Sequence, residues 1–184
     1  MELLNDFQTS VRKAFDEIDS SWESYQGLVV CGTHSTEISI GHILYKIREA
    51  RENRIPFLGI CAGMQATAVE YVKNVLGIED ATSEEFGNGT LIVRKLPELR
   101  VGIFKVGDRM ESHWHNYYIP VEVMEKMKLP YIASGNIVEE FRLMGHPFFR
   151  AVQYHPEYQN TKEKQHPILK DFIQACKYKN HVAV

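Results

Sequence analysis

The sequence lacks a surplus of positive charge and any long apolar run, and each absence excludes a class of protein. Its 184 residues contain 21 Lys and Arg against 24 Asp and Glu, for a net charge of -3. Because binding to nucleic acid or an anionic membrane draws on a basic surplus, neither is expected as a partner. The apolar runs, such as residues 27–30 and 56–60, fall far short of the roughly 20 residues of a membrane-spanning helix.

Export signals and cysteine frameworks are also missing. The opening residues, Met-Glu-Leu-Leu-Asn-Asp, contain neither the basic nor the apolar segment of a secretory signal, which favours a cytoplasmic location. The three cysteines, Cys31, Cys61 and Cys176, are odd in number and unevenly spaced. This spacing fits neither a disulfide framework nor a Cys-x-x-Cys metal site. No metal or other cofactor is predicted.

The residues that are present have the composition of a folded domain. Hydrophobic residues make up 44% and charged residues 24%, and no linker or repeat interrupts residues 1–184, so one domain is predicted. Apolar periodicity predicts helices over residues 5–18, 40–53, 64–76 and 167–178, and strands over 27–30, 56–60 and 151–154. This alternation predicts an α/β fold with a parallel sheet. Short strands predicted at 91–93, 101–106 and 117–121 suggest a more antiparallel, β-rich section, after which a further strand is predicted at 138–144.

The strongest local motif is Gly-Ile-Cys-Ala-Gly at residues 59–63, between a predicted strand and a predicted helix. The two glycines allow a sharp turn that exposes the side chain of Cys61. The helix N-terminus favours a thiolate and supplies amide donors for an oxyanion, so the motif predicts a nucleophile. The alternative is a small buried residue in a tight turn, because free cysteine is among the most buried residue types.

A second cluster, Gln-Tyr-His-Pro-Glu at residues 153–157, also follows a predicted strand. His155 would accept the thiol proton of Cys61 and return it to the leaving amine, while Glu157 would orient the imidazole. Taken alone, the pair could be a loop histidine beside a surface carboxylate. Because sites in such folds gather at the carboxyl ends of parallel strands, the two clusters are expected to meet there.

Both clusters resemble the class I (triad) glutamine amidotransferases, and within them the glutaminase domain of CTP synthase. The similarity is carried, in the family's order, by residues 48–65, 74–77, 81–86, 145–149, 152–158 and 166–167. The resemblance implies a flavodoxin-like sandwich with a β-rich insertion and a shortened N-terminus. It also implies hydrolysis of the glutamine side-chain amide through a thioester on Cys61. By the same resemblance, Gln65 and Glu85 would contact the amino acid part of glutamine, and the N–H of Ala62 would form half of an oxyanion hole.

The sequence departs from the family at the other half of that hole. Where the family has Pro-Gly-Gly-Phe-Gly, residues 31–35 read Cys-Gly-Thr-His-Ser. Gly32 is kept, whereas Thr33 and His34 replace a glycine and a phenylalanine. A β-branched residue is poorly suited to a positive φ, so a reshaped oxyanion hole is expected if the loop requires one.

A second departure concerns the end of the pocket that would bind the α-carboxylate. CTP synthases carry Glu-Arg-His-Arg-His-Arg-Tyr, from which an arginine binds this group, whereas residues 111–117 read Glu-Ser-His-Trp-His-Asn-Tyr. Trp114 and Asn116 cannot supply the charge of a guanidinium. His113 and His115 would point the same way along a strand, but no third zinc ligand is evident. The predicted substrate is therefore glutamine or a related small amide.

The chain also lacks a phosphate loop of the Gly-x-x-x-x-Gly-Lys type, so it is not expected to make CTP alone. A single helix is predicted before the strand at 27–30, where the family has a strand, a helix and another strand. An exposed sheet edge is usually covered, which suggests a homodimer or a separate acceptor subunit. Two functions remain open: a stand-alone amidohydrolase, and a catalytically weak relative that acts as a binding or regulatory protein.

Overall fold

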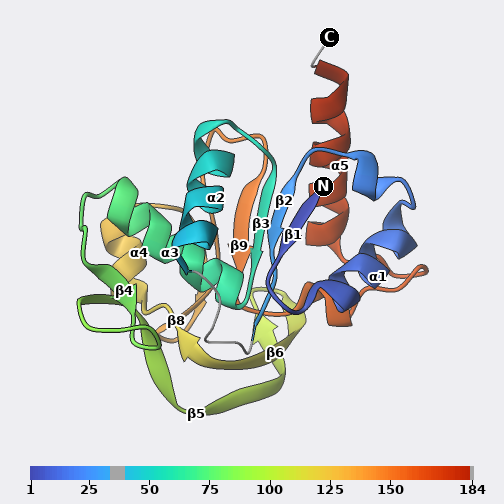
Figure 1. Cartoon of the computed structure of the whole chain (residues 1–184). Helices are drawn as coiled ribbons and strands as arrows, with labels where there is room; N and C mark the ends of the chain where they lie inside the picture. Colours follow the sequence, from blue (N-terminus) through green and yellow to red (C-terminus); the bar gives the residue numbers. More distant parts are fainter. Residues whose placement is uncertain (34–39, 183–184) are drawn as a thin grey trace.

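A computed structural model describes residues 1–33 and 40–182 and places a six-stranded sheet at the centre of the molecule (Figure 1). Its strands, in spatial order, are β1 (Glu2–Leu4), β2 (Leu28–Val30), β3 (Phe57–Ile60), β9 (Phe149–Val152), β8 (Ile137–Arg142) and β7 (Tyr131–Ser134). The first four are parallel, and β8 and β7 add antiparallel strands to the β9 side. The predicted parallel sheet is confirmed.

Helices cover both faces of this sheet (Figure 1). They are α1 (Gln8–Ile18), α2 (Ile40–Glu52), α3 (Ala62–Asn74), α4 (Val121–Met127) and α5 (Pro167–Val182). Apolar residues of α1 and α5 share one core with β3 and β9, including Phe15 and Phe172, whose stacked rings lie 5.8 Å apart. Helices α2, α3 and α4 bury their apolar residues on the other face. The result is the α/β sandwich that the sequence predicts.

A second, three-stranded sheet forms the β-rich insertion. It contains β4 (Ala81–Ser83), β5 (Thr90–Val106) and β6 (Arg109–Tyr118), and β5 and β6 pair as a long antiparallel hairpin. The predicted strand at 117–121 is wrong in part, because β6 ends at Tyr118 and α4 begins at Val121. Pro120 precedes α4 in an extended conformation, and Val123, Met124 and Met127 bury a helical stripe.

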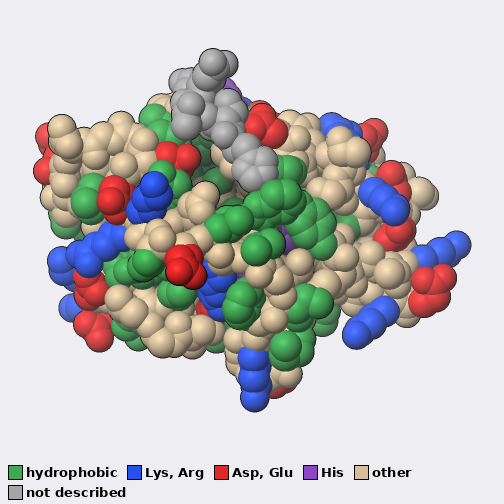
Figure 2. Space-filling view, turned by 90° about the horizontal axis from the view of Figure 1, so that it is seen from below, with side chains coloured by type: hydrophobic (Ala, Val, Ile, Leu, Met, Phe, Trp, Pro, Cys, Tyr) green, Lys and Arg blue, Asp and Glu red, His purple; other side chains and the backbone are tan. Residues whose placement is uncertain are grey.

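The two faces of the hairpin differ in an unexpected way. One face turns polar and charged residues inward, including Glu111, His113 and His115. The outward face exposes large apolar side chains, at Leu99, Val101, Ile103, Met110 and Trp114. Apolar side chains gather on the side of the molecule that Figure 2 shows.

Strand β1, at one end of the central sheet, is not predicted by the sequence. Its three residues pair in parallel with β2, so a strand does precede the first helix. Three residues are too short to produce a recognisable strand pattern. None of the helices within the described ranges has the length and apolar character needed to cross a membrane.

Candidate active site

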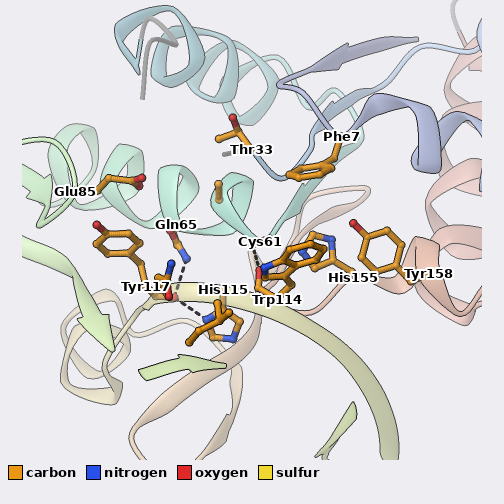
Figure 3. A pocket seen from close by; sticks show the side chains of 13 residues that line it. Phe7, Thr33, Cys61, Gln65, Glu85, Trp114, His115, Tyr117, His155 and Tyr158 are labelled. Atoms are coloured by element: carbon orange, nitrogen blue, oxygen red, sulfur yellow. Dashed lines mark hydrogen bonds between the residues drawn. The ribbon is translucent and has the colours of Figure 1, made fainter. Parts of the chain in front are cut away.

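Three loops that follow adjacent parallel strands meet at one edge of the central sheet. Gly32 follows β2, Cys61 follows β3, and His155 comes shortly after β9. Figure 3 shows Cys61 and His155 on the wall of a shared pocket, as the sequence predicts for loops at the carboxyl ends of parallel strands.

Cys61 occupies a sharp turn between β3 and α3. Its backbone has φ 54° and ψ -108°, and its N–H donates to the carbonyl of Val152 at 2.8 Å. A non-glycine residue held at such angles typically stores about 1–3 kcal/mol of strain, which the surrounding structure must overcome. Gly59 and Gly63 pack too closely on neighbouring backbone for either to accept a side chain. The turn therefore fixes the thiol at the pocket wall.

His155 connects this thiol to a buried carboxylate. Its Nδ1 donates to Oε1 of Glu157 at 2.7 Å, and the Cys61 thiol lies close enough to the ring to affect its pKa. Burial disfavours the imidazolium, but the neighbouring Cys61 and the hydrogen-bonded carboxylate of Glu157 outweigh this effect and raise the pKa of His155 to about 10. The imidazolium form of His155 is therefore the form that these surroundings favour at neutral pH.

The histidine ring is held in place from several sides. Tyr158 stacks on it with ring centroids 4.8 Å apart, and Phe7 meets it edge-on at 6.3 Å. A side chain at Gly32 would come within 3.1 Å of both His155 and Phe7. Phe7 and Tyr158 were not identified from the sequence, and only the closeness of Tyr158 to the 153–157 motif could have suggested one of them.

The other two cysteines lie in different surroundings. Cys31 and Cys176 are fully buried, whereas Cys61 is 7% exposed. Burial raises the pKa of both buried thiols well above the ordinary range, and the charge of Glu157 adds to the shift at Cys31. Neither is suited to act as a nucleophile at neutral pH.

The pocket beside Cys61 has a volume of about 150 Å³. Most residues predicted for the site line it, namely Thr33, Cys61, Ala62, Gln65, Glu85, Trp114, Asn116 and His155. Gly32 lies against His155, and Glu157 stands behind the same ring. His34 lies outside the described residues. The wall also includes Leu99, His115 and Tyr117, which the sequence analysis did not propose as contacts for a substrate.

Gln65 and Gln153 form a polar pair beside the thiol. The Gln65 amide nitrogen donates to the Tyr117 carbonyl at 3.0 Å and to Oε1 of Gln153 at 3.1 Å. The Gln153 amide nitrogen in turn donates to the Cys61 sulfur at 3.6 Å. Such a donor stabilises a thiolate. Gln153 stands in the predicted 153–157 motif, but its inward direction could not be read from that motif.

No Lys or Arg appears among the described residues that line the pocket. Arg100, which lies opposite His115 in the β5–β6 register, forms a salt bridge with Glu139 at 2.7 Å. The pocket does contain a carboxylate, Glu85, whose pKa is raised by burial. Its described wall therefore offers a partner for a positive group and no permanent cation for a negative one.

Thr33, in the described part of the segment after β2, does not have the positive φ that would strain a β-branched residue. Its hydroxyl donates to Asp6 at 2.5 Å. The carbonyl of Gly32 accepts a hydrogen bond from the N–H of Phe7 at 3.2 Å. On the other side of the pocket, Ala62 opens α3, where the first N–H groups have no partner within the helix.

His113 and His115 lie on the same face of β6, as the sequence predicts; this face is the inner one, and each histidine has protein partners. Nε2 of His113 lies 2.9 Å from Glu139, and Nδ1 of His115 donates to the Tyr117 carbonyl at 2.8 Å. Nε2 of His115 is buried without a hydrogen-bond partner among the described residues. Within the described ranges, no group of three or more His, Cys, Asp or Glu is placed to hold a metal ion.

The burial of His115 predicts a pH dependence of stability. Burial, together with the charges of His113 and Arg100, lowers its pKa to about 4 against the opposing effect of the Tyr117 carbonyl. The unfolded chain binds this proton near pH 6.5. Between pH 6.5 and 4 the unfolded state therefore holds the extra proton, so the free energy of unfolding falls as the pH falls, by about 3 kcal/mol over the window.

Replacement of His115 by Asn keeps an N–H donor but removes the titration. Urea unfolding at several values between pH 7 and 4 is expected to give a weaker pH dependence for this variant than for the wild type. His42→Asn, a change at an exposed histidine, serves as the control and should keep the wild-type dependence. Equal dependence in all three proteins would contradict the prediction.

Comparison with known proteins places this geometry in context. A family model described as glutamine amidotransferase class-I matches residues 4–175. A CTP synthase of Methanoregula boonei is 34% identical over an alignment of 188 positions, and the match covers 85% of this chain and 35% of that protein. A CTP synthase of Ruminiclostridium cellulolyticum is 34% identical over 191 residues, with coverage of 87% and 36%. The chain thus spans about a third of the length of these relatives.

A solved structure shows the same fold. The glutaminase domain of Trypanosoma brucei CTPS, solved with bound acivicin, matches with a TM-score of 0.83 and 22% identity. The match covers 96% of this chain and 92% of that chain. The flavodoxin-like sandwich expected from the sequence is confirmed.

Proposed function

The chain belongs to the class-I glutamine amidotransferase family, and we propose that it hydrolyses a small amide through a thioester on Cys61. The observation that carries this proposal is that Cys61 and His155 share the wall of a pocket of about 150 Å³, with His155 hydrogen-bonded to the buried carboxylate of Glu157. A strained turn presents the thiol, and the buried carboxylate of Glu157 holds the imidazole in the orientation that the chemistry needs.

In the proposed reaction, the Cys61 thiolate attacks the amide carbon and the carbonyl electron pair moves onto oxygen. The N–H of Ala62 at the start of α3 stabilises this oxyanion. The imidazolium of His155 gives its proton to the nitrogen, and ammonia leaves as the carbon–nitrogen bond breaks. His155 then removes a proton from water, whose oxygen attacks the thioester, so that a carboxylate is released and the thiol is restored.

The lining of the pocket supports a substrate other than free glutamine. The α-carboxylate of glutamine would be buried without a Lys or Arg among the described lining residues, whereas Glu85 could pair with an amino group. Trp114, with 47% of its surface exposed, offers an apolar face instead. We therefore propose a related amide with a neutral group in place of the α-carboxylate. We also propose that a second copy of the chain, or a separate acceptor subunit, covers an end strand of the central sheet, β1 or β7.

Replacement of Asn116 by Arg tests the substrate assignment. A charge-assisted hydrogen bond is worth about 1.5–3 kcal/mol, so the added guanidinium is expected to raise kcat/KM for glutamine by roughly 10- to 150-fold. The same change should leave hydrolysis of glutamine α-methylamide nearly unchanged, because this analogue has no carboxylate. Ammonia release from the side-chain amide is the measurement.

Asn116→Gln, which changes length without adding charge, is the matched control and should behave as the wild type does. If the wild type hydrolyses free glutamine as efficiently as the methylamide, another group must bind the carboxylate. The proposed change of substrate would then be wrong, while the proposed hydrolysis would stand.

A further inference from the structure

A second cavity, with a volume of about 160 Å³, adjoins the pocket that contains Cys61. The two share four lining residues, Thr33, Ala62, Gln65 and Glu85, so they are neighbouring parts of one hollow. Beyond these shared residues the lining becomes mainly apolar. A closed apolar cavity of about 150 Å³ is large enough to bind benzene, so this space can hold a hydrocarbon group.

One face of α3 forms the floor of this second cavity. Ala62, Ala66, Val69 and Lys73 all line it, and their spacing places them on a single helical face. At 1.5 Å per residue, this face runs for about 16 Å away from the turn at Cys61. The floor is therefore an apolar helical face that begins at Ala62, directly after the proposed nucleophile, and ends at Lys73.

Helix α2 and the segment after β4 form the walls. Ile40, Ile43 and Leu44 face the cavity from α2, and Phe86 lines it with 41% of its surface exposed. These wall residues are separate from the proposed catalytic residues Cys61, His155 and Glu157. We call this space, between α2, α3 and the segment after β4, the side groove.

We propose that the side groove binds the hydrocarbon part of an amide whose reacting carbonyl lies at Cys61. This inference rests on the proposed function, since it extends the substrate of the same site. The occupant is the remainder of the substrate, because the groove joins the pocket at Ala62 and Gln65 and continues along aliphatic side chains. The substrate class is a primary amide with an aliphatic chain.

Binding of n-alkanamides to the full chain with Cys61→Ala tests the side groove without turnover. Butanamide, hexanamide and octanamide are titrated by calorimetry. Each methylene buried in the groove is expected to tighten binding about fourfold. Ala66→Phe, made in the same background, fills the groove and should abolish this dependence on chain length.

A second variant keeps the test decisive if Ala66→Phe does not fold. Phe86→Ser removes an exposed apolar wall and should weaken octanamide binding several-fold more than butanamide binding. Leu76→Ser, a change at a similarly exposed apolar residue that does not line the groove, is the matched control and should bind both amides unchanged.

Two outcomes would overturn the side groove: affinity that is independent of chain length, or equal chain-length dependence in the Phe86→Ser variant and its control. Chain-length-dependent binding together with no ammonia release by the wild type would support the groove and contradict the proposed hydrolysis. Ammonia release without any chain-length dependence would do the reverse.

Discussion

Replacement of Cys61 by Ser is expected to reduce ammonia release from the best amide substrate by roughly 10⁴- to 10⁶-fold, the loss seen when a nucleophile is removed from a catalytic triad. The serine hydroxyl does not ionise near neutral pH, so the paired anion that attacks the carbonyl is lost. The measurement is ammonia release from glutamine, its α-methylamide and the n-alkanamides, for wild type and variant.

Cys176→Ala is the matched control, because it removes a thiol that is fully buried between α5 and the sheet. It should retain activity in whatever fraction of the protein folds, measured by circular dichroism. Activity that survives Cys61→Ser would contradict the proposed thioester. A wild type that releases no ammonia from any of these amides would instead favour the alternative, a binding or regulatory protein.

The sharp turn at Cys61 could be predicted from the sequence because its determinants are local. Gly59 and Gly63 flank the cysteine, a buried strand precedes it and a helix follows it within five residues. The structure adds what spacing cannot give, namely the positive φ of Cys61 and the inward direction of Gln153. Both depend on the packing of β3 against β9, whose residues are far apart in the chain.

Strand β6 was only partly predicted. Its polar residues face inward and its large apolar residues face outward, which is the reverse of the usual alternation. Buried Glu111 lies 3.0 Å from His166, and buried His113 lies 2.9 Å from Glu139. These partners are 55 and 26 residues away, so no local pattern indicates that the charged face is the inner one. A buried charge is tolerated only when it is paired, and the pairing appears only in three dimensions.

His155→Asn is expected to slow alkylation of Cys61 by iodoacetamide at pH 7 by roughly 30-fold, because an unassisted cysteine is only a few per cent thiolate there. Hydrolysis should fall by roughly 10²- to 10⁴-fold, since the leaving nitrogen also loses its proton donor. In the wild type, peptide mapping should find Cys61 labelled before Cys31 and Cys176, whose thiol pKa values are raised by burial.

The pH profile separates pairing from a merely structural role of His155. The pKa of His155 is raised to about 10, so the imidazolium of the proposed pair persists through this range. Alkylation of wild-type Cys61 should therefore change little between pH 7 and 9. In His155→Asn the rate should instead rise steeply with pH, as for an ordinary thiol. Glu157→Gln, which keeps the imidazole and removes the carboxylate, should fall between the two. An unchanged rate and profile in His155→Asn would mean that the imidazole does not pair with the thiol, and the proposed mechanism would lose its base.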